Sequence, residues 1–139
     1  MAFLLLIVEP PGQRATRAPA EARDLYDAMV AYGEGLRDAG QLLAGESLRP
    51  DDHAVRISTR EGKLQVVDGP FAETKEMVGG FFLIDVATRD EAVAIAHCCP
   101  AIAWASVEVR ECAPCHAGGQ NHNPSPTYQE IPCSSPRRS

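Results

Sequence analysis

The sequence predicts an α+β domain in which two helices cover one face of an antiparallel sheet. Continuous apolar segments at residues 3–8 and 80–86 are typical of strands that are buried on both faces. Each is followed by a segment whose apolar residues recur at helical spacing, and a hairpin pattern at residues 55–67 lies between the two halves. The predicted order, strand–helix–strand, hairpin, strand–helix–strand, is the ferredoxin-like plan.

The first helix is predicted to begin at Pro19 and to end at Gly40. Proline suits the first turn of a helix because its missing N–H is not needed there, and glycine commonly ends a helix. The apolar positions at helical spacing are Leu25, Met29, Tyr32 and Leu36. Gly33 and Gly35 each cost this helix about 1 kcal/mol relative to alanine, so we expect close packing against them. A strand at residues 41–48 follows.

The second helix is predicted to begin with a capping box at Thr88. The Thr88 hydroxyl accepts a hydrogen bond from one free backbone N–H while Glu91 reaches back to another. Its buried stripe consists of Ala92, Ile95, Ala96 and Cys99. Pro100 stops the helix, and the alternation at residues 103–110 predicts the last strand.

Length, composition and charge limit the classes of function. The 139 residues suit one domain, expected at residues 1–111, followed by a tail at 112–139 rich in Pro, Ser, Asn, Gly and Cys. The net charge of −6 argues against nucleic-acid binding, which requires a basic surface. No apolar run approaches the roughly 18 residues of a membrane span, and no signal peptide precedes the first strand. We therefore expect a cytoplasmic protein whose five cysteines are reduced thiols.

The two faces of the predicted sheet are both apolar. Phe3, Leu5 and Ile7 point to one face of the first strand. Leu4, Leu6 and Val8 point to the other face. Two helices cover only one side, and an apolar patch of several hundred Å² is more than soluble monomers usually expose. The sequence therefore predicts a homodimer formed through the sheet face.

Residues 68–76, Asp-Gly-Pro-Phe-Ala-Glu-Thr-Lys-Glu, concentrate charges around a turn between two apolar strands, with Gly79-Gly80-Phe81 just behind. A hairpin loop has no structural need for so many charges beside a phenylalanine, so this stretch favours chemistry or ligand binding. The stretch resembles the signature of the DGPF proteins, part of the YciI-like (YCII-related) family. The resemblance covers roughly residues 2–111.

The resemblance implies a dimeric α/β barrel, in which two such sheets pair. The smaller YciI-type proteins have a histidine–aspartate pair proposed to be catalytic, but Met29 stands where that histidine would lie. The resemblance therefore implies no histidine-based mechanism here. DGPF-type domains also resemble partners of extracytoplasmic-function sigma factors, so a sigma factor is a candidate partner.

Asp68 is the first candidate for a catalytic base or a ligand anchor, because it follows a strand and lies at a turn. The alternative is that Asp68 caps its own turn. Glu46 would share acid and base roles with Asp68 if both point into one cleft. Otherwise Glu46 is an exposed charge at a strand end.

The candidate ligand-binding residues are Glu73, Lys75, Phe71 and Tyr32. Lys75 would act as a point charge toward an anionic ligand. The loop is equally consistent with solvated Glu–Lys pairs that contribute under about 1 kcal/mol. Phe71 would stack on a ligand or anchor the loop in the core, and Tyr32 would line a pocket or pack in the core with its hydroxyl at the surface.

Residues 112–116 have the C-x-x-C-H spacing of c-type haem attachment. Without an export signal or a helical pocket, haem is not expected. Zinc at Cys112 and Cys115 with His122 or Cys133 fits no standard finger. A disulfide or plain thiols explain these cysteines more simply, so the sequence predicts no metal and no cofactor.

Two functions remain open. The first is a cofactor-free enzyme that performs acid/base chemistry on a small polar organic molecule, in a cleft lined by the DGPF loop. The second is a non-catalytic ligand-binding or regulatory module that uses the same cleft. A structural domain without a ligand is the third and simplest interpretation.

Overall fold

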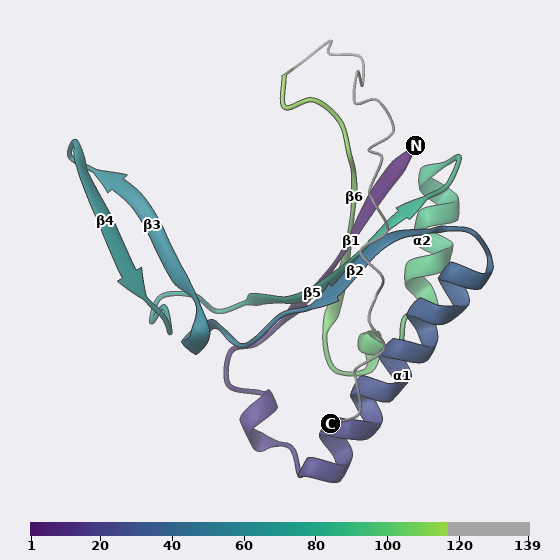
Figure 1. Cartoon of the computed structure of the whole chain (residues 1–139), viewed down its shortest axis with the longest axis horizontal. Helices are drawn as coiled ribbons and strands as arrows, with labels where there is room; N and C mark the ends of the chain where they lie inside the picture. Colours follow the sequence, from purple (N-terminus) through teal and green to yellow (C-terminus); the bar gives the residue numbers. More distant parts are fainter. Residues whose placement is uncertain (117–139) are drawn as a thin grey trace.

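The computed structural model describes residues 1–116 (Figure 1). Its strands are β1 (Ala2–Glu9), β2 (Leu42–Ser47), β3 (Val55–Arg60), β4 (Lys63–Asp68), β5 (Met77–Asp85) and β6 (Ser106–Glu111). Its helices are α1 (Pro19–Asp38) and α2 (Arg89–His97), and short 3-10 turns lie at Arg14–Thr16, Asp51–His53 and Pro100–Ala103. This order confirms the predicted α+β class.

The four-stranded sheet has the strand order β2-β5-β1-β6, and all neighbouring strands are antiparallel. In the central register Leu5 of β1 lies opposite Phe82 of β5 on one side and Val109 of β6 on the other. Helices α1 and α2 lie on the same side of this sheet (Figure 1). The predicted ferredoxin-like plan, with two helices on one face, is therefore confirmed.

The last strand begins at Ser106, later than predicted. Pro100 does stop α2, but the chain then makes the 3-10 turn Pro100–Ala103, in which Trp104 N donates to Ala101 O at 3.0 Å. The apolar residues of this turn continue the hydrophobic pattern of the strand, and the sequence alone does not separate the two. Ala101 is buried against the sheet as part of a connector.

The core lies between the sheet and the helices. Phe3, Leu5 and Ile84 are fully buried, and Ala92 and Ala96 of α2 pack against them. The Thr88 half of the predicted capping box of α2 is confirmed, whereas Glu91 reaches one residue beyond the N-cap, to Ala87. Glu91 N donates to Thr88 Oγ1 at 3.2 Å, and Ala87 N donates to Glu91 Oε2 at 3.2 Å.

Phe82 explains one of the two glycines in α1. A Cβ atom on Gly33 would lie 3.1 Å from Phe82 Cε1, and one on Gly45 of β2 would lie 2.9 Å from Phe82 Cδ1. Both backbones therefore approach the ring more closely than a larger residue would allow. Gly35 has no neighbour within 4 Å of its ideal Cβ position, so close packing does not explain it.

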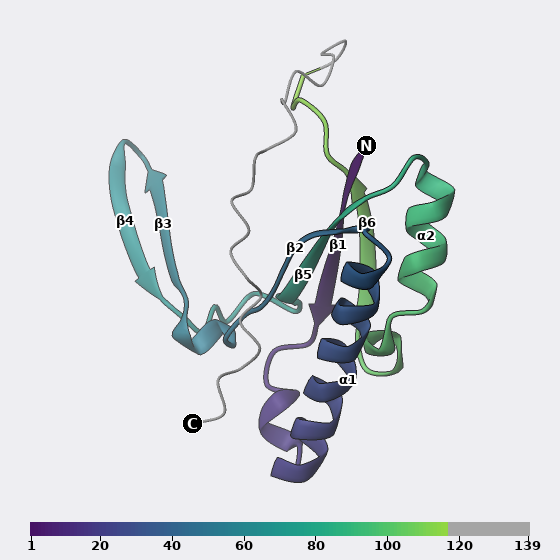
Figure 2. The same cartoon turned by 45° about the vertical axis from the view of Figure 1, so that its right-hand side comes forward.

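The sheet face opposite the helices, called here the open face, is not covered by any helix of residues 1–116 (Figure 2). Register places Leu6 of β1 beside Phe81 of β5, and Leu4 beside Leu83. Leu4, Leu6 and Phe81 are only half-buried, and Val78 is exposed. The open face is thus apolar in its centre.

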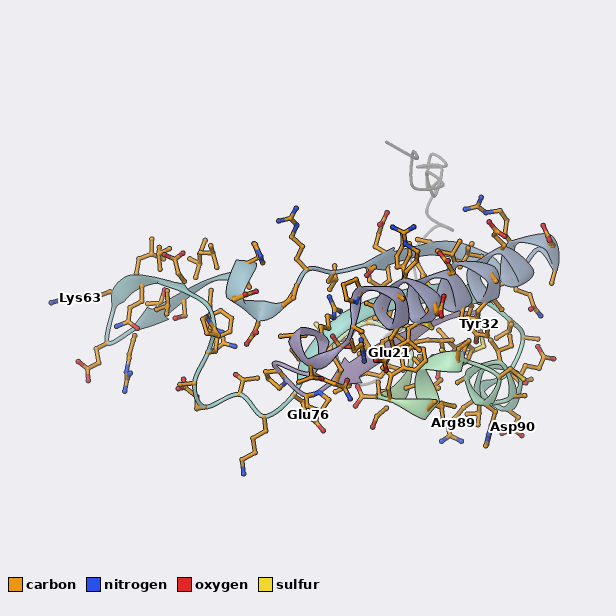
Figure 3. The ribbon with its side chains drawn as sticks, turned by 90° about the horizontal axis from the view of Figure 1, so that it is seen from below. Glu21, Tyr32, Lys63, Glu76, Arg89 and Asp90 are labelled. Atoms are coloured by element: carbon orange, nitrogen blue, oxygen red, sulfur yellow. The ribbon has the colours of Figure 1, made fainter. Side chains whose placement is uncertain are left out.

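Strands β3 and β4 form a separate two-stranded sheet, called here the arm, which confirms the predicted hairpin. Its turn consists of Glu61 and Gly62, whose φ angles of 51° and 75° are both positive, as the favoured two-residue hairpin turns require. The arm projects from the body on the side away from the helices (Figure 2). All residues of both strands are exposed, and Lys63 lies at the tip (Figure 3).

Candidate functional site

A cavity of about 350 Å³ lies between α1 and the sheet, at the end where β1 leads into the first loop. Its apolar wall includes Ile7, Leu25, Met29, Phe82 and Trp104. Its inner polar wall is formed by Glu9, Arg14 and Arg17. The exposed residues Glu34, Arg37 and Glu46 also border it. Small-molecule sites combine apolar walls with a few polar groups in this way, and this volume suits a small ligand.

Glu9 is the buried carboxylate of this cavity. It continues the inward alternation of Phe3, Leu5 and Ile7 along β1, and only 3% of it is exposed. Its Oε1 atom lies 2.5 Å from Arg14 Nε, yet no donor in residues 1–116 is aligned for a hydrogen bond to that oxygen. Arg14 therefore balances the charge of Glu9, while the Oε1 atom of Glu9 can still accept a hydrogen bond.

Arg14 is held by the backbone as well as by Glu9. Its Nη1 donates to Leu48 O at 2.6 Å and its Nη2 donates to Gly79 O at 3.0 Å. The guanidinium thus joins β1, the end of β2 and β5. This bonding fixes the position of the positive charge beside Glu9.

Gly79 makes room for this ion pair. The β1–β5 register shifts between Ile7 and Val8, so Gly79 lies at a β-bulge. A Cβ atom there would lie 2.6 Å from Arg14 Nη2 and 2.7 Å from the Glu9 carboxyl carbon. Only glycine lets the strand pass the two charged groups at this distance.

Arg17 forms the other polar part of the wall. Its Nη2 donates to Gln13 Oε1 at 3.1 Å, and its guanidinium carbon lies 5.8 Å from the centre of the Trp104 ring. Gln13 also donates from Nε2 to Trp104 O at 3.0 Å. One glutamine therefore positions both the arginine and the tryptophan.

Tyr32, a predicted ligand-binding residue, packs inside the core. Its ring meets Phe82 edge-on, and its hydroxyl donates to Ile95 O at 2.6 Å. Burial, with a smaller effect of the Cys99 and Cys98 thiols, raises the pKa of this hydroxyl well above its ordinary value. Tyr32 thereby ties α1 to α2 as a neutral hydrogen-bond donor, and it is not part of the cavity wall.

Asp68 lies exposed at the end of β4, opposite Val55, and does not border the cavity. The next residue closes the base of the arm, because Gly69 N donates to Ala54 O at 2.8 Å. A Cβ atom on Gly69 would overlap the carbonyl oxygen of Asp51. Glycine is therefore required where the motif passes the turn Asp51–His53.

The other residues of the motif lie beside the arm. The Arg56 guanidinium carbon lies 3.8 Å from the centre of the Phe71 ring. Glu73 and Lys75 are exposed. Neither of them borders the cavity, and Phe71 does not border it either. Glu76 lies in the same connecting segment (Figure 3). In the single chain these residues form a polar surface next to the arm.

Glu46 borders the cavity from β2, where register places it opposite Phe81. Opposed residues share a face, so its side chain belongs to the open face with Phe81 and Leu6. Of Glu46 and Asp68, the two carboxylates that the sequence suggests as an acid–base pair, only Glu46 borders this cavity. Sequence reasoning missed Glu9, although its place in the alternation of β1 was a usable signal.

No group of three or more His, Cys, Asp or Glu side chains in residues 1–116 is arranged to hold a metal ion. His122 and Cys133, named above as candidate ligands, lie outside the described residues. Within the same described part, no helix is both long and apolar enough to cross a membrane.

A family model described as the YCII-related domain matches residues 1–115. The uncharacterized protein R00369 of Rhizobium meliloti (strain 1021) is 46% identical over 71 residues, which are 51% of this chain and 54% of that protein. The chain thus spans about half the length of this relative.

A solved structure with a similar course of the chain is 5-chloro-2-hydroxyhydroquinone dehydrochlorinase (TftG) from Burkholderia phenoliruptrix AC1100, in complex with 2,5-dihydroxybenzoquinone. It is 20% identical, the match covers 81% of this chain and 93% of that one, and the TM-score is 0.48. A likeness this distant does not bear on activity.

Proposed function

The chain belongs to the YCII-related domain family, and we propose that it is a cofactor-free enzyme that binds a small organic molecule in the cavity beneath α1. Glu9 would accept a proton from this molecule and return it. The observation that carries the proposal is a carboxylate, only 3% exposed, that borders a largely apolar cavity. A buried carboxylate is costly unless it is paired, so such a group at a cavity wall is a candidate for catalysis.

The surroundings of Glu9 support proton transfer. Arg14 orients the carboxylate, and its own position is set by two carbonyl groups. A fixed base loses little freedom when it meets the substrate. The apolar wall formed by Ile7 and Phe82 limits the access of water to the reacting atoms. These groups suit the removal of a proton from a carbon beside a carbonyl.

Asp68 remains a competing candidate for the base, with Glu46 and Lys75 assisting. This second assignment places the chemistry at the DGPF loop. In a single chain the loop is exposed, so this assignment requires another surface to enclose Asp68.

Deuterium labelling distinguishes the two assignments even while the substrate is unidentified. A bacterial small-molecule extract is incubated with the protein in D₂O, and compounds that gain deuterium at carbon are identified by mass spectrometry. We expect labelling by the native protein and by Glu111→Gln, an exposed control at the end of β6. We expect loss of labelling in Glu9→Gln, which keeps the shape of the side chain.

Loss of labelling in Asp68→Asn, with labelling retained in Glu9→Gln, would move the catalytic role to the DGPF loop. A compound that binds without labelling by any form of the protein would favour the regulatory module, for which a sigma factor is the candidate partner. Thermal unfolding of each variant checks that it is folded.

We also propose that a second copy of the chain covers the open face. Leu6 and Phe81 are half-buried at the centre of this face. The arm has an apolar side too, because register puts Ile57 beside Val66 and Leu64 beside Thr59. An isolated two-stranded hairpin is at best marginally stable, so this side also favours a partner.

Light scattering on a sizing column tests the dimer. We expect twice the 15.0 kDa mass of the chain at micromolar concentration. Leu6→Glu places a charge at the centre of the open face and should give a monomer. A native protein that elutes as a monomer would refute this proposal and leave the cavity unaffected.

A further inference from the structure

The cavity contains a cation that is not neutralised by residues 1–116. Arg17 borders the cavity and is half-buried, yet no carboxylate of those residues forms an ion pair with it. Its acceptor there is the neutral amide oxygen of Gln13 at 3.1 Å. Its remaining N–H groups have no acceptor in that part of the chain.

Arg14, the neighbouring cation, differs in this respect. Glu9 balances its charge, and the Leu48 and Gly79 carbonyls occupy its Nη1 and Nη2 atoms. A ligand therefore finds Arg14 already bonded and Arg17 available. Glu34 and Glu46 also border the cavity, but both are exposed, and neither pairs with Arg17.

The position of Arg17 is set in advance. Gln13 accepts from its guanidinium and donates to the Trp104 carbonyl at 3.0 Å. The guanidinium carbon lies 5.8 Å from the centre of the Trp104 ring, within the range of a cation–π contact. A planar guanidinium held in this way presents a ready edge to a carboxylate.

The rest of the cavity limits the charge and shape of the ligand. Ile7, Met29 and Phe82 offer apolar surface, which suits an organic body. Glu9 carries a negative charge in the same cavity, so a dianion such as a phosphate monoester would be repelled more strongly than a monoanion. Arg37 is also without an ion pair within residues 1–116, but it is exposed at the border of the cavity. Farther in, one half-buried arginine without an ion pair beside one buried carboxylate matches a single negative charge at one end of the ligand.

We infer that the cavity takes a small monocarboxylic acid with an apolar or aromatic body. Its carboxylate pairs with Arg17, and its body lies along Trp104 toward Glu9. This inference rests on the proposed function, because it names the ligand class for the same cavity. Arg17 would be a binding residue, and Gln13 would be a positioning residue that acts through it.

Matched acids and amides test the inference by calorimetry or ligand-observed NMR. Benzoate is compared with benzamide, and indole-3-acetate with indole-3-acetamide, so that the apolar body stays constant. For the native protein we expect each acid to bind about tenfold more tightly than its amide, as for a hydrogen-bonded charge pair.

Three variants of the full chain locate the effect. Arg17→Gln should lose about tenfold in acid affinity while the amides bind unchanged. Arg17→Lys keeps the charge and should retain part of the acid preference. Arg89→Gln removes an equal charge in the first turn of α2, away from the cavity wall, and should bind both ligands like the native protein (Figure 3).

Acids that bind no better than amides up to about 10 mM, or an acid preference that survives in Arg17→Gln, would overturn the inference. If the amides bind better than the acids, the cavity remains a ligand site and only the ligand class is wrong. If no probe binds and no labelling occurs in D₂O, the proposed function fails as well.

Discussion

The cavity end of β1 and the arm place charged residues in opposite settings. At the cavity, Glu9 is 3% exposed, and its partner Arg14 bonds to the Leu48 carbonyl just after β2 and to the Gly79 carbonyl of β5. In the arm, Lys63 and Asp68 are exposed, and no ion pair joins residues of its two strands. The arm and its loop nevertheless carry the most conspicuous motif of the sequence. The many charges close together in the sequence at residues 68–76 therefore belong to an exposed region. The enclosed site is marked instead by one charged residue, Glu9, within the alternating apolar residues of β1.

The largest expected contrast is between buried and exposed leucines. Leu5 is 0% exposed, so Leu5→Ala should leave a void and lower the free energy of unfolding by about 3 kcal/mol. Leu64 in the arm is 72% exposed in the single chain, so in the monomer expected from Leu6→Glu the change Leu64→Ala should alter that free energy by less than about 0.5 kcal/mol. Urea unfolding measures both. In the native protein, a larger loss for Leu64→Ala that depends on protein concentration would indicate a second copy packed on the arm. A loss in the monomer that is as large as for Leu5→Ala would contradict the exposure of Leu64.

The next contrast is between two glycines that have no room for a side chain. Gly79→Ala would push against Glu9 and Arg14, so it should cost about 2 kcal/mol and also weaken acid binding. Gly69→Ala would push against the Asp51 carbonyl at the base of the arm. It should move the arm and leave acid binding in the cavity unchanged. Equal binding losses in the two variants would contradict the assignment of the site to the cavity, and calorimetry with benzoate decides between them.

The smallest contrast is between two adjacent cysteines. Burial raises the pKa of the Cys99 thiol, an effect that a backbone hydrogen bond from Ala101 partly opposes. The unfolded chain ionises this thiol at its ordinary pKa, so stability should fall as pH rises from there toward the folded value. Cys99→Ala should flatten this decline, whereas Cys98→Ala, at an exposed position, should not. Unfolding free energies below the ionisation range of tyrosine, about pH 10, test the difference. If stability declined equally with pH in Cys99→Ala and Cys98→Ala, the assignment of this decline to Cys99 would be contradicted.

The fold was predictable because its signals are local. Alternation along β1, the capping box at Thr88 and the Gly62 turn are each contained in a few neighbouring residues. The predicted start of the last strand was wrong, because an apolar 3-10 turn before β6 continues the hydrophobic pattern of the strand.

The candidate site was less predictable because long-range contacts build it. Arg14 is positioned by the Gly79 carbonyl, and Arg17 by the ring of Trp104, which lies far along the chain. Nothing in the loop that carries these two arginines indicates such partners. Glu9 could have been found, because it follows Ile7 by two positions on the inward side of the strand.

The most direct test is to map the amide resonances that shift when benzoate is added to the ¹⁵N-labelled protein. We expect the largest changes at Arg17, Gly79 and Gly80, which surround the polar end of the cavity. Changes confined to residues 68–76, with the resonances around Glu9 unmoved, would place the binding site at the DGPF loop and contradict its assignment to the cavity.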